Sequence, residues 1–445
     1  MTPREALKMK MELDMAWRDM EVLRKRFPQT WPAPTTIKKE ATNLIEQLEL
    51  KTVSLPSDSG EIVSLTKVGN MVNLLKQMFI SAKKSLGKKV PRRKTIRVTC
   101  CLSVDGFSFQ KHNGKSCNYT CASIRIVKIG ESQTATAQRV CHTPVFLMIN
   151  SKEDQLGSIV RQAFDEVRKL EEIVLAEEKT KLEMDYVISC DLKAFGIINR
   201  TKNLGNRLDY CIYGCCRESR SGSSVADPLR TGGIPTIEKN RDQVFDSLHL
   251  KLNLCKKLID GLVQVSAQSD DKNVLKEESD RVHAFIQNQL RLHKAVAGSF
   301  TGAASDKILK HFPAILKDCF PQFQEDKIKD WKELFKVTRF IVQMASKTTT
   351  VLTRDKKKLE TTLEEHDRLF DKLGITYASY EHYCKFHLLE LLGWYGCIGN
   401  FSLQSVEANN ALVKDTIKHH TCAASEVDPQ ALKYLLLRAI VTQDY

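Results

Sequence analysis

The segment from residue 95 to residue 191 constrains the fold of this chain most, because four strand-like runs fall within it. β-Branched, aliphatic and thiol residues dominate these runs, which end at turn residues and therefore predict β-strands. The runs are TIRVTCCLSVDG, CASIRIVKIG, HTPVFLMIN and MDYVISCD. A helical pattern from Glu153 to about Lys181 separates the third run from the fourth. Three strands, a helix and a fourth strand predict an α/β domain with a central sheet.

Helical patterns dominate the regions on either side of this segment. At the N-terminus, Thr2 and Glu5 have the spacing of a capping box, and Pro3 suits the first helical position. A further helix is predicted from Thr36 to about Leu50, and nearly everything from Asp242 to about Leu373 has a helical period. The N-terminal helices suit a compact DNA-binding or dimerisation module, and a bundle without a partner fits their pattern equally well.

The charge balance points to a polyanionic partner. The chain has 68 Lys and Arg against 54 Asp and Glu, a formal net charge of +14, which favours nucleic acid over an anionic membrane. One run, Lys83 to Arg97, contains eight basic residues and no acid, and its glycine and proline predict a linker. Such a run suits phosphate contacts or a nuclear import signal, and a solvated loop is the alternative. The candidate DNA-binding residues in it are Lys88, Lys89, Arg92, Arg93 and Lys94.

The fourteen cysteines predict reduced thiols rather than a disulfide framework. Their spacing is irregular, the chain is large, and no N-terminal segment resembles a secretion signal. Four of them, Cys100, Cys101, Cys121 and Cys190, lie inside strand-like runs, where cysteine behaves as a small buried hydrophobe. The longest apolar runs are too short to cross a bilayer, so no membrane segment is expected.

Three acidic residues have the order expected of a two-metal site for phosphoryl transfer. Asp105 and Asp191 end two strands that are expected to be neighbours, and Glu407 lies on a predicted helix far downstream. Carboxylates that converge from separate elements hold two Mg²⁺ ions about 4 Å apart in such sites. Taken singly, each aspartate also suits a turn or a helix cap, and Glu407 suits an exposed helix face.

A second candidate site combines two histidines with a distant cysteine cluster. His382 and His387 lie five residues apart, which places them about 140° apart on a regular helix, so a shared ion requires a helix end or a kink there. Cys211 and Cys215 would complete a closed, structural Cys₂His₂ zinc site. Cys216 is an alternative to Cys215, and the His pair alone also suits a purely structural role.

These residues resemble a known family, the catalytic subunit of the V(D)J recombinase and the related Transib DNA transposases. The resemblance lies in TPREALKMKMELDMAWRDMEVLRKRF, in VDG at Asp105, in CHTPVFLMINSKEDQLGSIV and in EANN at Glu407. The spacing is also similar, because twenty residues separate Asp191 from Cys211 and twenty separate His387 from Glu407. One departure is that CxxxC replaces the family's CxxC, which affects the assignment of Cys215.

The resemblance implies an RNase H-like catalytic domain interrupted by a zinc-binding helical insertion. It implies that Asp105, Asp191 and Glu407 hold two Mg²⁺ or Mn²⁺ ions, and that Cys211, Cys215, His382 and His387 hold one structural Zn²⁺. It also implies a nuclear homodimer acting on double-stranded DNA with terminal inverted repeats, by nicking, hairpin formation and strand transfer. Whether an accessory subunit is needed stays open. Phe401, six residues before Glu407, stands where the vertebrate recombinase has an aromatic that stacks on a displaced base, and core packing is the alternative.

The implied organisation has five parts. They are a helical dimerisation and DNA-binding module (1–50), a basic pre-catalytic linker region (51–98), the first part of the catalytic core (99–210), the zinc-binding insertion (211–387), and the core helix with Glu407 followed by a C-terminal helix (388–445). Two other functions stay open: a domesticated relative that binds DNA without cutting it, and an unrelated RNase H-like nuclease. A zinc deaminase is disfavoured, because neither cysteine cluster reads P-C-x-x-C.

Overall fold

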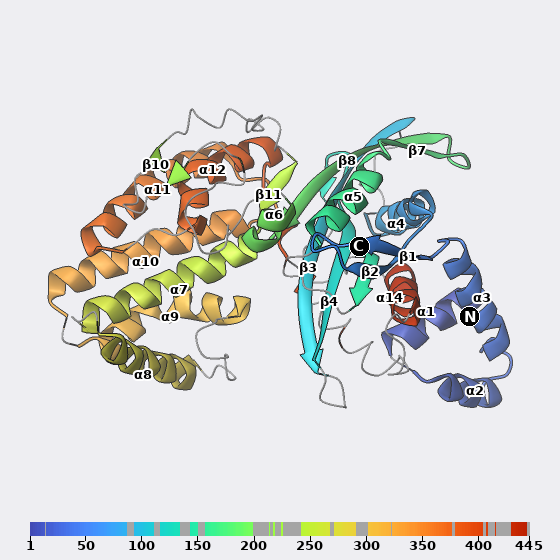
Figure 1. Cartoon of the computed structure of the whole chain (residues 1–445), viewed down its shortest axis with the longest axis horizontal. Coiled ribbons are helices and arrows are strands. Elements are labelled where there is room, and N and C mark those ends of the chain that lie inside the picture. The colour runs from blue at the N-terminus through green and yellow to red at the C-terminus, as the bar shows by residue number, and fades with distance from the viewer. Residues whose placement is uncertain are drawn as a thin grey trace. The chain divides into compact units, whose positions relative to one another are not determined.

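The architecture comes from a computed structural model of the whole chain (Figure 1). The residues that it describes are 1–13, 15–86, 93–110, 116–133, 143–149, 156–198, 213, 217–218, 224–225, 242–267, 271–290, 301–321, 323–375, 379–403, 406–407, 414 and 429–442. The chain divides into two compact units: unit 1 contains residues 1–202 and 404–445, and unit 2 contains residues 203–403. No helix in these ranges has the length and apolarity needed to cross a membrane.

Unit 1 is a mixed α/β structure built on one sheet. Its strands lie in the order β1-β2-β6-β4-β3-β8. Their bounds are β1 Lys51–Pro56, β2 Ile62–Lys67, β3 Thr95–Gln110, β4 Ser116–Ile129, β6 Thr143–Ile149 and β8 Thr180–Cys190; the short strands β5 Ser132–Gln133 and β7 Glu172–Leu175 pair with β4 and β8. Most pairs are antiparallel, but β3 and β8 are parallel. The sequence prediction of an α/β fold is confirmed at this level.

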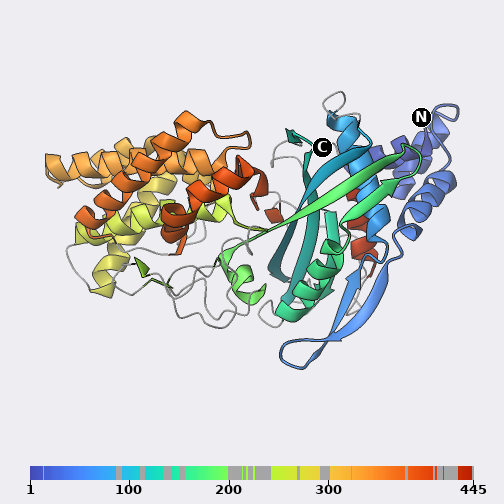
Figure 2. The ribbon, with the colours of Figure 1, turned by 90° about the horizontal axis from the view of Figure 1, so that it is seen from above.

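Helices cover both faces of this sheet. The helix α4 Met71–Leu86 lies on the same side as the last helix, α14 Pro429–Thr442, and α5 Gly157–Arg168 lies on the other (Figure 2). The short helix α6 Leu192–Ile198 packs on α5 and against β8. The strand thiols predicted to be buried are at most 2% exposed, which confirms their role as core residues.

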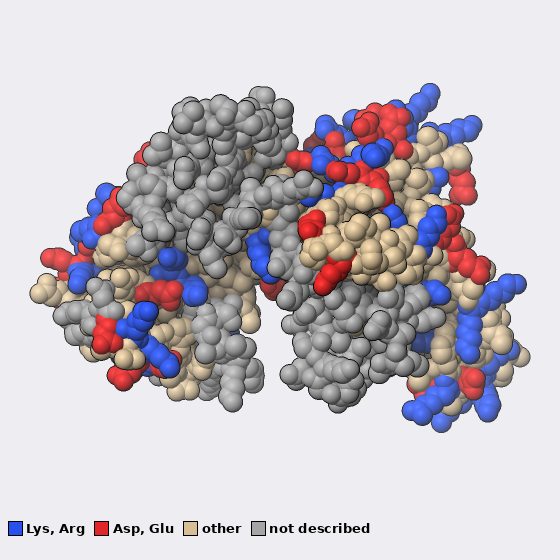
Figure 3. Space-filling view, in the orientation of Figure 1, with Lys and Arg blue, Asp and Glu red and all other residues tan. Residues whose placement is uncertain are grey.

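The N-terminal helices form a small core together with α14. They are α1 Pro3–Glu12, α2 Trp17–Arg26 and α3 Pro34–Glu46. Buried side chains from α1, α2 and α3 meet Leu437 and Val441 of α14 in one apolar cluster. The predicted capping box is confirmed, because Glu5 N–H donates to Thr2 Oγ1 at 3.2 Å and Thr2 N–H donates to Glu5 Oε2 at 2.7 Å. Lys and Arg side chains gather over α2 and α3 (Figure 3).

Two expectations about unit 1 are wrong. The helix predicted from Glu153 to about Lys181 ends at Arg168, and the chain then forms the antiparallel pair β7–β8. Glu172, Ile173, Val174 and Leu175 alternate between exposed and buried, so pairing with β8 determines the conformation although several neighbours favour helix. The region 51–98 also holds the hairpin β1–β2 and α4, rather than only a linker.

Unit 2 is predominantly helical, as its period predicts. Its helices are α7 Ser247–Ala267, α8 Lys272–Leu290, α9 Gly302–Cys319, α10 Glu325–Ser346, α11 Thr353–Leu373, α12 Ser379–Tyr395 and the 3₁₀ turn η4 Gly399–Phe401; the short strands are β9 Arg217–Glu218, β10 Ser224–Val225 and β11 Gln243–Phe245. The helix α10 packs on α11, α7 and α9, and α7 also packs on α12. Fully buried aromatic side chains, among them Trp331 and Phe370, fill the space between these helices.

Candidate functional site

Asp105 lies within β3, the strand between β4 and β8 in the sheet of unit 1. Its strand, β3, continues to Gln110, so the expectation that Asp105 ends this strand is wrong. What ends beside it is the parallel neighbour β8, whose last residue is Cys190. Opposite Asp105 on the other side stands Cys121 of β4. Burial and the carboxylate of Asp105 raise the pKa of the Cys121 thiol to about 12.

Asp191 follows β8 directly and caps the next helix. Its Oδ1 accepts a hydrogen bond of 2.6 Å from the N–H of Ala194, and its carbonyl accepts one of 3.0 Å from the N–H of Phe195. The helix-cap alternative for this residue is therefore observed. A cap leaves Oδ2 without a role in the helix, and the side chain is only half-buried. Capping and metal binding are thus compatible for this carboxylate.

The parallel ladder of β3 and β8 ends just before the two predicted aspartates. In the parallel ladder each residue of β3, from Thr95 to Leu102, pairs with the residue 86 positions later. Asp105 and Asp191 have the same offset and follow three residues after the last pair. Continuation of the ladder by three residues would set Asp105 beside Asp191, although Asp191 itself lies past the end of β8, at the cap of α6.

The thiol of Cys190, the last residue of β8, is fully buried. Burial raises the pKa of this thiol well above its ordinary value, and the charges of Asp191 and Asp105 raise it further. A hydrogen bond from the β3 backbone at Val104 acts in the opposite direction. One sulfur therefore lies within the electrostatic reach of both aspartates.

Glu407 belongs to the same compact unit as the two aspartates. The described part of its segment, Val406 and Glu407, is helical, with Val406 buried and Glu407 exposed. Val406 therefore faces the core, and Glu407 faces outward, where its carboxylate can meet solvent or a ligand. The remainder of EANN lies outside the described residues.

His382 and His387 form a buried pair on α12 in unit 2. They are 4% and 2% exposed, and their ring centroids are 5.3 Å apart. The helix runs from Ser379 to Tyr395 through both residues, so the kink expected for a shared site is not needed to bring the rings together. One carboxylate oxygen of Glu390 lies 3.8 Å from Nδ1 of His387.

Tyr213 packs directly on this histidine pair. It is 1% exposed, its ring centroid lies 4.6 Å from that of His387, and its hydroxyl donates to the carbonyl of Gln243 at 3.2 Å. In sequence it stands midway between Cys211 and Cys215, which lie outside the described residues, as does Cys216. Within the described ranges, no group of three or more His, Cys, Asp or Glu side chains is arranged to hold a metal.

The candidate DNA-binding residues are only partly described. Arg93 and Lys94 are exposed at the start of β3, while Lys88, Lys89 and Arg92 lie outside the described residues. Phe401 in η4 is 5% exposed and its ring packs edge-on against Tyr395, with centroids 5.1 Å apart. In this conformation the phenyl ring of Phe401 contributes to the core of unit 2, as the packing alternative expects.

Asp246 is a structural residue that the sequence did not reveal. It is fully buried in unit 2, and its oxygens accept hydrogen bonds from the N–H groups of Leu248, His249 and Leu403 at 2.8–3.0 Å. It thereby joins the start of α7 to Leu403, four residues before Glu407. An Asp ahead of a predicted helix signals a cap, but its contact 157 residues away has no local sequence signal.

No protein-family model matches the chain, and no curated protein matches it in sequence.

Proposed function

We propose that this chain is a DDE-type DNA transposase or recombinase of the kind its sequence resembles. The proposal is supported chiefly by the parallel ladder of β3 and β8, which ends at Leu102 and Ile188, three residues before Asp105 and Asp191. Two carboxylates on adjacent parallel strands, with a third from a distant helix of the same unit, suit an RNase H-like catalytic domain. Asp105, Asp191 and Glu407 are proposed to hold two Mg²⁺ or Mn²⁺ ions.

The residues present fit such ions. Carboxylates that converge on one site repel each other, and a divalent cation bound between them would reduce this repulsion. Divalent ions in such a site supply positive charge to the phosphate oxygens that gain negative charge during strand cleavage and strand transfer. The protein's own part is to hold the carboxylates in place, which Asp191 achieves through its cap on α6.

A structural Zn²⁺ is proposed at His382, His387, Cys211 and Cys215. Two buried imidazoles with centroids 5.3 Å apart suit one nitrogen from each ring on a common ion, at about 2.0–2.1 Å. The packing of Tyr213 on His387 supports a site that also includes the cysteines on either side of this tyrosine. The ion would fix the segment entering unit 2 to α12, and it would take no part in the reaction.

The rest of the proposal follows the resemblance. The partner would be double-stranded DNA with terminal inverted repeats, bound by a homodimer in the nucleus, with nicking followed by hairpin formation or strand transfer. The net charge of +14 and the basic side chains over α2 and α3 support a polyanionic partner (Figure 3).

Plasmid nicking by conservative variants tests this proposal. The substrate is a supercoiled plasmid carrying the inverted repeats that flank the gene, with Mg²⁺ or Mn²⁺. We expect Asp105→Asn, Asp191→Asn and Glu407→Gln each to lower the nicking rate about a thousandfold or more while DNA binding persists. Asp191→Asn is especially informative, because asparagine caps a helix as well as aspartate does. The matched control is Asp165→Asn, which changes an exposed acid on α5.

Three outcomes contradict the proposal. The first is a single-acid variant that nicks at the wild-type rate. The second is a wild-type protein that binds DNA but does not cut it with either metal, as a domesticated relative would behave. The third is preferential cleavage of RNA or of RNA–DNA hybrids, which would indicate a different RNase H-like nuclease.

A further inference from the structure

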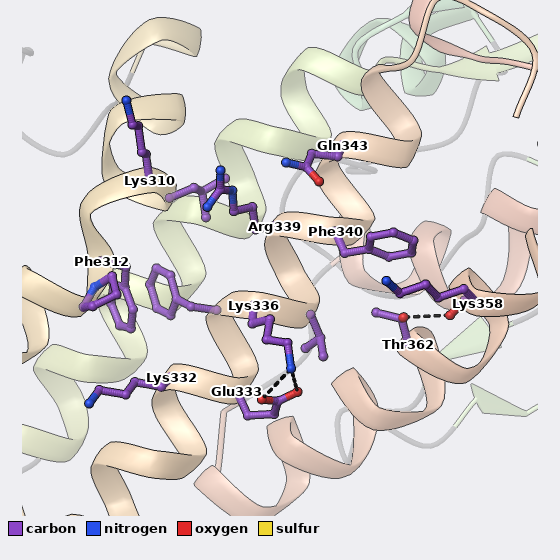
Figure 4. A pocket seen from close by; sticks show the side chains of 14 residues that line it. Lys310, Phe312, Lys332, Glu333, Lys336, Arg339, Phe340, Gln343, Lys358 and Thr362 are labelled. Atoms are coloured by element: carbon purple, nitrogen blue, oxygen red, sulfur yellow. Dashed lines mark hydrogen bonds and ion pairs between the residues drawn. The ribbon is translucent and has the colours of Figure 1, made fainter. Parts of the chain in front are cut away.

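A basic cavity lies between three helices of unit 2. Its volume is 430 Å³, and side chains of α9, α10 and α11 line it (Figure 4). Five of these side chains are cationic: Lys310 of α9, Lys332, Lys336 and Arg339 of α10, and Lys358 of α11. Buried Phe312 and Phe335 form part of its apolar wall. The cavity is remote in sequence from the three acids and from the zinc candidates.

The cations in this cavity are largely uncompensated. Glu333 is the only acid in its lining, and it pairs with Lys336 at 3.0 Å and 3.2 Å. No described residue forms an ion pair with Lys310, Lys332 or Arg339. All five cationic residues are exposed, and like charges gathered around one small space repel each other. A multiply charged anion would relieve this repulsion.

The arrangement extends along one face of α10. Lys332, Lys336, Arg339 and Gln343 stand at helical spacings over about 16 Å of helix. Figure 4 shows Lys310 and Arg339 at one end, Lys332 at the other, and Lys358 beside Phe340 on the α11 side. The ammonium of Lys358 lies 4.6 Å from the centroid of the Phe340 ring. The cations thus come from three helices and are spread along the opening instead of forming a single point of charge.

These features indicate the class of ligand. Arginine offers a planar fork of donors and lysine a point charge, the two groups that proteins use to bind phosphate. Several separated cations require several phosphate groups. The volume lies within the range of small-molecule sites, about 300–1,000 Å³. A DNA duplex is too wide to enter such a space, so a compact polyanion fits better than a double helix.

We propose that this cavity binds a small, multiply phosphorylated molecule. An inositol polyphosphate and a nucleoside triphosphate share the required chemistry, and the experiment distinguishes them. The site is separate from the proposed strand-cleavage centre and does not depend on that assignment. Binding there would draw α9, α10 and α11 together and stabilise unit 2.

Calorimetric titration of the full chain tests this inference. The probes are inositol hexakisphosphate, ATP with Mg²⁺, and a short single-stranded oligonucleotide, each at physiological salt. We expect saturable binding of at least one of the two small probes. The double variant Lys310→Glu/Arg339→Glu should weaken it about tenfold or more, since each lost charge-assisted contact removes a large share of the affinity. Which small probe binds identifies the source of the phosphates.

The matched control is Lys317→Glu/Lys357→Glu, which makes the same charge change on α9 and α11 with exposed lysines outside the cavity. It should retain at least half of the wild-type affinity. Thermal unfolding verifies that both double variants are folded. The inference is overturned if neither small probe binds, if both double variants weaken binding alike, or if the oligonucleotide binds and neither small probe displaces it.

Discussion

His366 is a buried imidazole on α11 whose environment disfavours its charged form. The side chain is 2% exposed, and Nε2 has no hydrogen-bond partner among the described residues. Burial, followed by the positive charge of Lys385, lowers the pKa of His366 from its ordinary value to about 3. The ring packs on Phe370, with centroids 4.3 Å apart. His366 therefore behaves as an apolar core residue while it remains neutral.

Acid should destabilise unit 2 through this histidine. In the unfolded chain His366 takes up a proton below about pH 6.5, whereas in the folded chain it does so only near pH 3. The stability that neutral His366 contributes is thus fully present above pH 6.5 and is lost as the pH falls from 6.5 towards 3. At pH 5 the unfolding free energy should be lower by about 2 kcal/mol. Urea unfolding at pH 7.5 and pH 5 should show this loss in the wild type but not in His366→Leu.

A substitution at the exposed His311 of α9, His311→Gln, is the control for this measurement. It should leave the pH dependence of unfolding as it is in the wild type. If His366→Leu loses as much stability between the two pH values as the wild type does, the environment assigned to His366 is wrong.

The sequence predicts individual acids for the proposed site, but it does not predict their surroundings. Asp105 and Asp191 were predicted from turn residues after apolar runs, and their register supports a shared site. The strand containing Asp105 nevertheless continues past it, because β4 pairs with β3 as far as Gln110. A turn signal such as Asp105-Gly106 is local, whereas cross-strand pairing depends on residues far along the chain.

The segment that leads to Glu407 is tightly anchored in unit 2. Gly399 N–H donates to the carbonyl of Lys347 at 3.1 Å, and the side-chain amide of Asn400 donates to the carbonyl of Thr348 at 3.1 Å. A Cβ at Gly399 would stand 2.4 Å from the carbonyl oxygen of Ser346 and 2.5 Å from that of Lys347. Only glycine permits this close approach of two backbones.

Alanine at Gly399 and at Gly393 should therefore have opposite effects. Gly399→Ala requires the backbone of η4 to move, and we expect a loss of about 2 kcal/mol or more in unfolding free energy. Gly393 lies in α12, where a Cβ would meet nothing within 4 Å, so Gly393→Ala should stabilise the helix by up to about 1 kcal/mol. Denaturant unfolding compares the two variants. Similar effects at both positions would contradict the close approach at Gly399.

Element prediction from sequence succeeded where the period was long and failed where it was short. The helices of unit 2 contain 17 to 22 residues each, which gives the apolar period several turns to appear. The strand β7 has only four residues, and the glutamates and lysines around it favour helix. The strand β7 is extended because it pairs with β8. Its own residues therefore do not show where helix α5 ends and β7 begins.

The division into two units predicts separable responses to metal removal. If zinc links the Tyr213 segment to α12, a chelator should lower the melting temperature of unit 2 and leave that of unit 1 unchanged, because structural zinc contributes directly to folding. Calorimetry of the full chain, with elemental analysis of its zinc content, measures both effects. His382→Ala should lose the metal, whereas His311→Ala, at an exposed histidine, should retain it. Folded protein without zinc would contradict the site.

At the scale of the whole chain, the sequence does not predict contacts between residues that are far apart in it. The buried carboxylate of Asp246 binds the N–H of Leu403 across 157 residues, and α14 completes the core of the N-terminal helices. Both contacts join parts that no local pattern relates. The division at residues 202–203 and 403–404 likewise follows from packing, whereas the residue patterns suggested a return to the catalytic core near residue 388.

The central claim is that Asp105, Asp191 and Glu407 share their metal ions, and iron-directed backbone cleavage tests it most directly. Fe²⁺ replaces Mg²⁺, and ascorbate with peroxide then generates hydroxyl radicals that cut the chain beside the bound ion. We predict cuts next to all three acids in the wild type, all suppressed by Mg²⁺ and all weakened together by Asp191→Asn. Cuts beside only one acid, or cuts beside Asp105 that persist in Asp191→Asn, would contradict the account.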